Sequence, residues 1–229
     1  MGGIRWHCFP DAPAVAREAV QRILEAARQA IEQRGEFRLV LAGGSTPRLV
    51  YRQLAETSAD YSHWHFYLGD ERCLKPDDGD RNSFTICNDW LDHSTVPEEH
   101  IHWISAELGP EEGARLYESL VRSVLPFDLV MLGMGEDGHT ASLFPGHRHD
   151  QSRLVVPVYQ SPKPPLERVS LNFSALSQTR ELLVLVTGEG KRSAVQAWRD
   201  NGDDLPVAAL RCDAGIDVLL DDKAAGEQC

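Results

Sequence analysis

The sequence has no excess of basic residues. Its 229 residues include 23 Lys and Arg against 35 Asp and Glu, which gives a formal net charge of −12 at pH 7. Contact with nucleic acid or with an anionic membrane through a broad basic face is therefore disfavoured, because both partners require positive charge opposite them. An anionic small molecule remains compatible with this composition, since a few cations focused in one cleft can bind it.

The sequence is also poor in cysteine and in long apolar runs. The five cysteines are scattered and none forms a CxxC pair, which is not the pattern of a disulfide framework. The longest apolar runs, of about five to seven residues, are too short to span a membrane, and the segment Met1–His7 lacks the apolar region of a signal peptide. We therefore expect a soluble, cytoplasmic protein with reduced thiols. The cysteines are Cys8, Cys73, Cys87, Cys212 and Cys229.

Two signatures of catalytic sites are missing as well. There is no HExxH motif and no Cys/His pair at zinc spacing, although His139, His147 and His149 lie close together in the sequence. No Gly-x-Ser-x-Gly elbow is present to activate a serine nucleophile. The sequence therefore predicts neither a dedicated metal site nor a nucleophilic serine.

What the sequence does contain is an alternation of helices and strands. Apolar residues recur at spacings of three and four from Ala12 to Gln33, which predicts an amphipathic helix that Gly35 ends. A buried strand over 37–42, a glycine loop over 43–47 and a helix over 48–55 follow. Further predicted strands are 64–68, 127–132, 168–173, 181–186 and 218–220, and further predicted helices are 84–91, 113–124 and 191–198.

This alternation predicts an α/β fold. We expect a single domain over residues 1–229, with a mostly parallel, doubly wound central sheet flanked by helices. In such sheets ligands bind outside the carboxyl ends of the strands. Four loops at those ends, 43–47, 69–72, 133–140 and 187–191, are rich in glycine and polar residues. We expect them to converge on one cleft, and we expect Asp77–Asp80 and Ser161–Pro165 to be surface loops.

The first of these loops has the features of a phosphate site. Gly43 and Gly44 allow close approach of the backbone, and Ser45 and Thr46 add hydroxyl donors. Free N–H groups at the start of the following helix attract an anion. The loop is not a P-loop, because the Gly-Lys-[Ser/Thr] ending is absent. An ordinary tight turn between strand and helix is the alternative.

The segment Gly133–Gly138 matches the dinucleotide fingerprint G-x-G-x-x-G. Glu136 and Asp137 inside the loop would repel a pyrophosphate, and the motif lies past the middle of the chain. We therefore interpret Asp137 and His139 as members of a catalytic turn instead. The alternative is that they only cap the turn that follows.

Other charged residues stand at or near strand ends. Asp70 and Arg72 follow the strand 64–68, where a solvated salt-bridge cluster is the alternative to a catalytic role. Lys191 at the start of a helix is suited to hold a phosphate as a point charge. Lys163 and Arg168 are further candidates for phosphate binding. For these cations the alternative is an ordinary surface position.

Taken together, six segments resemble those of the 6-phosphogluconolactonase family, in the same order along the chain. The resemblance implies a fold like that of glucosamine-6-phosphate deaminase and ribose-5-phosphate isomerase. It implies hydrolysis of 6-phosphoglucono-δ-lactone to 6-phosphogluconate in the pentose phosphate pathway, with no cofactor and no metal. The segments are Leu41–Pro47, Leu68–Arg72, Arg81–Ser83, Leu132–Pro145, Ser161–Pro165 and Thr187–Lys191.

The deaminase is the nearest alternative, as an enzyme acting on a related sugar phosphate. It is similar at the Asp-Gly-His turn, but it has a Glu five residues after the His, where this chain has Phe144. It also lacks the Arg that follows Asp-Glu, which is Arg72 here. Both differences favour the lactonase.

The chemistry of lactone hydrolysis suggests a role for each of these residues. An imidazole can accept a proton from water near neutral pH, so His139 is the expected general base. Asp137 or Asp70 would orient it, and Arg72 with backbone N–H groups would stabilise the oxyanion or, for Arg72, the phosphate. The expected phosphate ligands are Gly43, Gly44, Ser45, Thr46, Lys163, Arg168 and Lys191. The expected partner is a small-molecule substrate for a monomer or small homo-oligomer.

Overall fold

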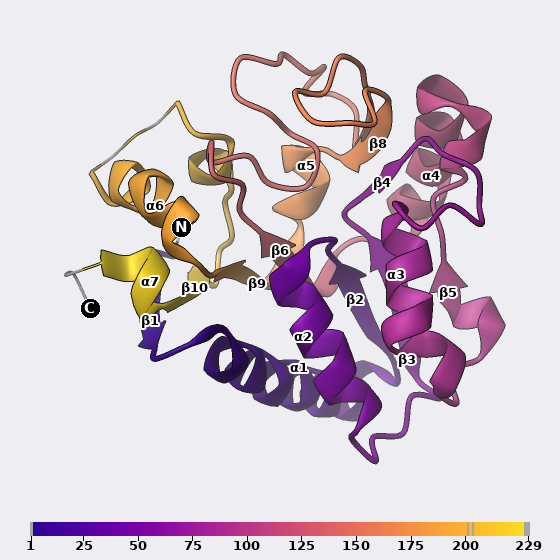
Figure 1. The fold of residues 1–229 in the computed structure, drawn as a ribbon. Helices are drawn as coiled ribbons and strands as arrows, with labels where there is room; N and C mark the ends of the chain where they lie inside the picture. The colour runs from indigo at the N-terminus through magenta and orange to yellow at the C-terminus, as the bar shows by residue number, and fades with distance from the viewer. Residues whose placement is uncertain (1, 201, 203, 227–229) are drawn as a thin grey trace.

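A seven-stranded parallel sheet forms the centre of the protein (Figure 1). The computed structural model describes residues 2–200, 202 and 204–226. The strand order is β1-β10-β9-β6-β2-β3-β5, which confirms the predicted α/β class with a mostly parallel sheet. The strands are β1 (Ile4–Phe9), β2 (Phe37–Leu41), β3 (Trp64–Leu68), β5 (Ile101–His102), β6 (Phe127–Gly133), β9 (Thr179–Val186) and β10 (Ile216–Asp221).

A second, smaller sheet is antiparallel and has the order β4-β8-β7. Its strands are β4 (Asp70–Arg72), β7 (Val155–Val158) and β8 (Arg168–Leu171). Residues 69–72 were predicted to be a loop, and for β4 this prediction is wrong because β4 pairs with β8 about a hundred residues later. The predicted strand 168–173 ends early, because the Asn172 side chain accepts from the backbone N–H of Phe173 and starts a new helix there.

The helices surround the sheet, with α1 and α2 packed side by side (Figure 1). In α1, Asp11 caps the first turn by accepting from the N–H of Ala14 at 2.8 Å, and Gly35 ends the helix with a φ of 83°. The helix buries one stripe that includes Val15, Ala19 and Ile23. The helices are α1 (Ala12–Arg34), α2 (Ser45–Ala55), α3 (Asn82–Asp89), α4 (Pro110–Val124), α5 (Phe173–Leu176), α6 (Arg192–Arg199) and α7 (Asp222–Ala225).

Five short 3₁₀ segments connect these elements within the described residues: η1 (Leu91–His93), η2 (Glu98–His100), η3 (Ala106–Leu108), η4 (Glu189–Lys191) and η5 (Pro206–Ala209). Strand β1 was not predicted from the sequence, because its segment mixes charged and aromatic residues. It lies at the edge of the sheet, where half of its side chains are exposed. The strands β5 and β7, of two and four residues, were not predicted either. Helix α2 begins at Ser45, three residues before the predicted start.

The sheet has a topological switch point between β2 and β6. From β2 the chain proceeds through α2 to β3 on one side, whereas from β6 it proceeds to β9 on the other side. Connections that leave adjacent parallel strands in opposite directions open a crevice at the carboxyl ends of those strands. The loops that follow β2 and β6 are therefore placed to form a binding site.

The strands of the central sheet carry the core. Residues such as Leu39, Val130 and Val184 are fully buried. No described helix is long and apolar enough to cross a membrane.

The cysteines differ in part from expectation: Cys8 is disulfide-bonded, although the sequence predicted reduced thiols. Cys73, Cys87 and Cys212 are free, and the prediction for Cys229 falls outside the described residues.

Candidate active site

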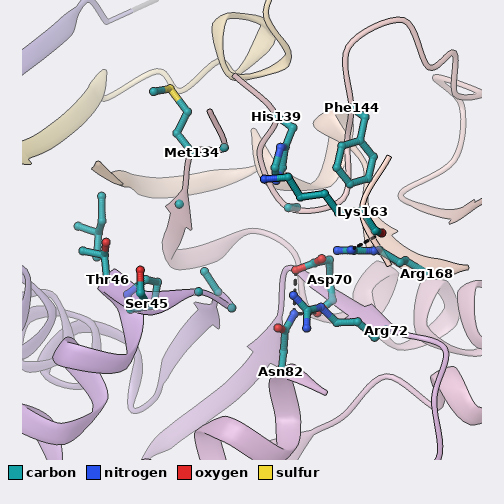
Figure 2. A pocket seen from close by; sticks show the side chains of 18 of the residues that line it. Ser45, Thr46, Asp70, Arg72, Asn82, Met134, His139, Phe144, Lys163 and Arg168 are labelled. Carbon is teal, nitrogen blue, oxygen red and sulfur yellow. Dashed lines mark hydrogen bonds between the residues drawn. The ribbon is translucent and has the colours of Figure 1, made fainter. Parts of the chain in front are cut away.

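A cavity of about 310 Å³ opens at the carboxyl ends of β2, β6 and β9 (Figure 2). The four loops predicted to converge all contribute residues to it. It also receives residues from the segment 163–168 and from the start of α3. Its lining is Ala42, Gly43, Gly44, Ser45, Thr46, Pro47, Asp70, Arg72, Asn82, Gly133, Met134, Gly135, His139, Ala141, Phe144, Lys163, Pro164, Arg168, Leu185, Thr187 and Lys191.

One wall of the cavity is the amino end of α2. Gly44 precedes the helix with a φ of 110°, a conformation that favours glycine. A Cβ at Gly43 would lie 2.0 Å from Oδ1 of Asn82, so only glycine fits there. The first N–H groups of the helix have no partner within it and can bind an anion. The hydroxyls of Thr46 and Thr187 lie 2.6 Å apart and join this wall to the loop after β9.

The turn after β6 holds the imidazole of His139 against the carboxylate of Asp137. Oδ1 of Asp137 lies 2.5 Å from Nδ1 of His139. The turn closes on itself, because the N–H of Gly135 donates to the carbonyl of His139 at 2.8 Å. A Cβ at Gly135 would lie 2.0 Å from Nδ1 of His139, so the ring requires glycine beneath it. The N–H of Val207 donates to the carbonyl of Gly138 at 3.0 Å and supports the turn from outside.

The environment of Asp137 favours its charged form. Burial alone would raise the pKa of this carboxyl, but the hydrogen bond and the charge of His139 outweigh burial and hold the pKa below its ordinary value. A carboxylate at Nδ1 leaves Nε2 of the ring as the nitrogen able to accept a proton. Of the two carboxylates that sequence reasoning considered as the orienting group, Asp137 is the one in contact with His139.

Asp70 has different partners. Its carboxylate accepts from Oγ of Ser142 at 2.5 Å and from Nδ2 of Asn82 at 3.1 Å, and the residue is buried (Figure 2). These bonds join β4, the start of α3 and the turn after β6. Asp70 therefore lines the floor of the cavity and ties together three segments that form it.

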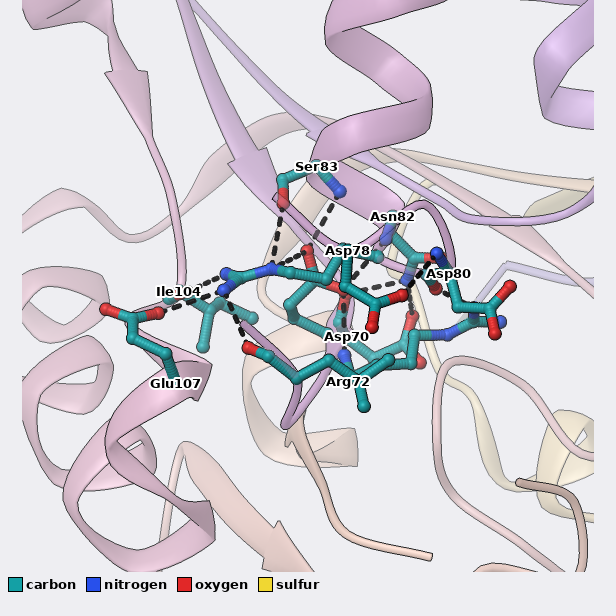
Figure 3. A network of polar contacts seen from close by, with 11 residues as sticks. Asp70, Arg72, Asp78, Asp80, Asn82, Ser83, Ile104 and Glu107 are labelled. Atoms are coloured by element: carbon teal, nitrogen blue, oxygen red, sulfur yellow. Dashed lines mark hydrogen bonds and ion pairs between the residues drawn. The ribbon is translucent and has the colours of Figure 1, made fainter. Parts of the chain in front are cut away.

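Arg72 is held by a polar network beside the cavity (Figure 3). Its Nη1 donates to the carbonyl of Asp80, while its Nε is buried and has no partner among the described residues. The neighbouring Glu71 is fully buried and accepts from the backbone N–H groups of Asn82 and Ser83 at 2.8 Å each. This carboxylate satisfies the free donors at the start of α3 and fixes the segment that carries Arg72.

Arg168 is largely occupied by the backbone. Its guanidinium donates to the carbonyls of Lys163, Pro164 and Pro165 at 3.0–3.2 Å, and it lies over the ring of Phe144 at 5.6 Å. Burial lowers the pKa of this guanidinium. The segment 161–165 is a largely exposed loop, as predicted, although Lys163 also lines the cavity.

The two lysines stand at the mouth of the cavity. Nζ of Lys163 lies 3.9 Å from Oε2 of Glu136, and Figure 2 shows the Lys163 side chain reaching toward His139. Burial is the largest influence on Lys191 and lowers the pKa of its ammonium. Lys191 is half-buried, which differs from the exposed position of an ordinary surface lysine.

Several lining residues were not predicted from the sequence as site residues, and Asn82, Thr187 and Phe144 are the most informative of them. Asn82 and Thr187 lie in two of the segments that resemble the family, Arg81–Ser83 and Thr187–Lys191. Only that resemblance could have identified them as site residues. Phe144 was used only to separate two enzymes, yet its ring centroid lies 4.7 Å from that of His139. Within the described part of the chain, no group of three His, Cys, Asp or Glu side chains is arranged to hold a metal ion.

The family model for glucosamine-6-phosphate isomerases/6-phosphogluconolactonase matches residues 10–219. The chain belongs to this family. It is 35% identical to 6-phosphogluconolactonase of Mycobacterium tuberculosis over 88% of each chain. It is 31% identical to chloroplastic 6-phosphogluconolactonase 3 of Arabidopsis thaliana, over 86% of this chain and 66% of the relative.

Solved structures of the family have the same fold. The crystal structure of 6-phosphogluconolactonase from Thermotoga maritima is similar with a TM-score of 0.87 and 29% identity, covering 95% of this chain and 99% of the other. A monomeric glucosamine-6-phosphate deaminase has a TM-score of 0.84 at 22% identity, over 96% and 98% of the two chains, which shows a shared fold. The description of the matching family covers two activities, so the residues in the cavity must distinguish them.

Proposed function

We propose that this protein hydrolyses 6-phosphoglucono-δ-lactone to 6-phosphogluconate. The observation that carries the proposal is one cavity with two chemically different ends. The Asp137–His139 pair can activate water for attack on an ester. The amino end of α2 and the ammonium groups of Lys163 and Lys191 can hold a phosphate. The names of the relatives, 6-phosphogluconolactonases of 31–35% identity, support the same activity.

In the proposed reaction, His139 acts as a general base. Its Nε2 removes a proton from water as the water oxygen attacks the lactone carbonyl, and Asp137 stabilises the imidazolium that forms. The tetrahedral intermediate then collapses. The bond from carbon to ring oxygen breaks, and the imidazolium returns its proton to that oxygen. The new carboxylic acid loses its proton to solvent, so that one water is consumed and one proton is released.

The negative charge of the intermediate needs a donor. Arg72 is our candidate, because its guanidinium lines the cavity and carries donors besides the Nη1 that binds Asp80. A cationic donor placed in the cavity becomes most favourable when an oxyanion accepts from it. Arg168 is less suited to this role, because backbone carbonyls occupy its Nε and Nη2 and the Ser142 hydroxyl faces its Nη1. Its proposed contribution is to hold Lys163 in place.

The phosphate, remote from the reacting carbon, would bind at the amino end of α2. The backbone N–H groups after Gly43 and Gly44 face the cavity with the hydroxyls of Ser45 and Thr46. Lys191 approaches from the loop after β9. Binding energy gained there would position the lactone over His139.

Deamination of glucosamine 6-phosphate is the alternative within the family, and Phe144 argues against it. The buried ring of Phe144 packs beside His139, at the position where the deaminase carries a glutamate. A phenyl ring can neither donate nor accept a proton. The cavity therefore has one acid–base pair at its reacting end, as hydrolysis of a lactone requires.

The test is an assay of the purified protein with freshly generated 6-phosphoglucono-δ-lactone. The uncatalysed opening of the lactone is subtracted. In parallel, ammonia release from glucosamine 6-phosphate is measured. We expect rapid lactone hydrolysis and no ammonia. Ammonia release, or a rate no greater than the uncatalysed one, would contradict the proposal.

A further inference from the structure

Glu136 lies beside both lysines of the cavity without lining it. Its Oε2 is 3.9 Å from Nζ of Lys163. Its Oε1 would be 3.4 Å from a Cβ at Gly190, the residue before Lys191. The side chain itself is 64% exposed. The carboxylate therefore sits between the two loops that bring cations to the mouth of the cavity.

The electrostatics of this group involve Lys191 as well. After burial, which lowers the pKa of the Lys191 ammonium, the charge of Glu136 is the largest influence and acts in the opposite direction. Lys163 lowers this pKa and Asp137 raises it. The ammonium groups of Lys163 and Lys191 are thus close enough to repel each other. The carboxylate of Glu136 interacts with both and offsets this repulsion.

Such a carboxylate opposes the binding of an anion by the same lysines. It attracts their charge while the site is empty, and it repels a phosphate that enters. The repulsion grows with the charge of the ligand. With a phosphate near −2 at neutral pH, the lactone carries about −2, whereas the hydrolysis product carries about −3 because ester cleavage creates a carboxylate.

We propose that Glu136 determines specificity between substrate and product, by weakening the hold of Lys163 and Lys191 on the trianionic product more than on the dianionic lactone. This inference rests on the proposed function. It assigns to Glu136 no contact with the substrate and no step in the chemistry. The proposed effect of Glu136 is that the product dissociates faster than it would from a site without this carboxylate and with the same affinity for the substrate.

The decisive variant is Glu136→Gln, which keeps the size of the side chain and removes its charge. An exposed pair such as Glu136–Lys163 contributes little to folding, so the variant should fold normally. We expect the inhibition constant of 6-phosphogluconate to fall about three- to tenfold, and KM for the lactone to fall by a smaller factor. Raising the salt concentration should reduce both effects, because the Glu136 carboxylate is exposed.

The matched control is Glu189→Gln. Glu189 is exposed in the neighbouring loop and pairs with Arg192 at 3.4 Å rather than with either lysine of the cavity. It should leave both constants unchanged.

Two further measurements separate this inference from the proposed function. Direct binding of 6-phosphogluconate to Lys163→Met and to Lys191→Met tests whether the lysines hold the phosphate. If neither variant weakens binding, the proposed phosphate site is wrong and the role of Glu136 fails with it. If they weaken binding but Glu136→Gln changes product and substrate affinity equally, or no more than Glu189→Gln does, the role of Glu136 alone is overturned.

Discussion

Oδ1 of Asp137 lies 2.5 Å from Nδ1 of His139, and both residues belong to one glycine-bounded turn after β6. The sequence separation is only two residues, so the carboxylate and the imidazole are fixed by the same local backbone. Gly135 leaves room for the imidazole, and Gly138, with a φ of 77°, allows the chain to reverse. The pair is therefore preorganised before any substrate binds.

Replacing His139 by Ala should lower kcat by about 10²–10⁴-fold, the usual contribution of a general base, with a much smaller change in KM. Steady-state kinetics on the phosphorylated lactone provide the measurement. His63→Ala is a suitable control, because His63 is exposed and lies at the amino end of β3, whereas the cavity opens at the carboxyl ends of the strands. A His139→Ala enzyme with more than half of the original kcat would remove this residue from the mechanism.

Replacing Asp137 by Asn should lower kcat by about 10–10²-fold, less than loss of the imidazole itself. The amide keeps the shape of the side chain but not the charge that stabilises the imidazolium. Because the Asp137 pKa is below its ordinary value, kcat of the original enzyme should not fall through titration of this carboxyl above about pH 4. Equal rates for the Asn variant and the original enzyme would show that the carboxylate charge has no role.

Replacing Lys191 by Ala should raise KM for the phosphorylated lactone by about 10–150-fold, since a hydrogen bond to a charged group contributes about 1.5–3 kcal/mol. Hydrolysis of unphosphorylated gluconolactone should barely change, because it has no phosphate to lose. Lys75→Ala, at an exposed lysine outside the cavity, is the control. Equal impairment toward both lactones would mean that Lys191 acts at the carbonyl or supports the fold.

Local sequence predicted those parts of the site that local backbone builds. The strand–loop–helix around 37–55 and the turn 133–140 could be identified, because a strand, glycines and polar residues follow one another there. The partners of Arg168 could not be predicted. The sequence predicted its guanidinium as a phosphate ligand. In the structure it donates to the backbone carbonyls of residues 163–165, in the loop just before β8.

Contacts between distant segments account for the other differences. The bond of Asp70 to Ser142 joins residues 72 positions apart, and no periodicity or spacing indicates such a pair. The strand β4 is only three residues long and exists because β8 pairs with it. The sequence could thus identify Asp70 as a polar residue at a strand end. Whether it orients His139 or ties segments of the cavity together depends on tertiary packing.

The buried Glu71 should be needed for stability. It caps α3 through the N–H groups of Asn82 and Ser83 and lies 3.5 Å from Arg81. Replacing Glu71 by Gln should lower the free energy of unfolding by about 3–5 kcal/mol, because it removes a fully buried charge that faces the buried Arg81 guanidinium and leaves one backbone N–H at the start of α3 without its acceptor. Urea denaturation measures the change. Glu107→Gln, which affects a partly exposed carboxylate bonded to the same Arg81, should cost much less; a similar cost for both would contradict the special role of Glu71.

Asp217 should make the fold sensitive to acid. Burial alone would raise the pKa of this carboxyl, but hydrogen bonds from Arg5 and His7 and the charge of Arg22 hold it well below the ordinary value. A carboxyl whose folded pKa is depressed adds stability above its unfolded pKa of about 3.9, and this stability is lost as the pH falls through that value toward the folded pKa.

Replacing Asp217 by Asn should therefore lower the free energy of unfolding at pH 7 and flatten its decline between about pH 5 and pH 3. Denaturation curves at several pH values measure both effects. Asp213 is exposed and lies shortly before the start of β10, so Asp213→Asn should leave the pH dependence unchanged. If the Asp217 variant lost as much stability on acidification as the original protein, the charge cluster that joins β1, α1 and β10 would not be a source of acid sensitivity. That sensitivity would then have to come from other buried carboxylates, of which Glu71 and Asp128 are the first to test.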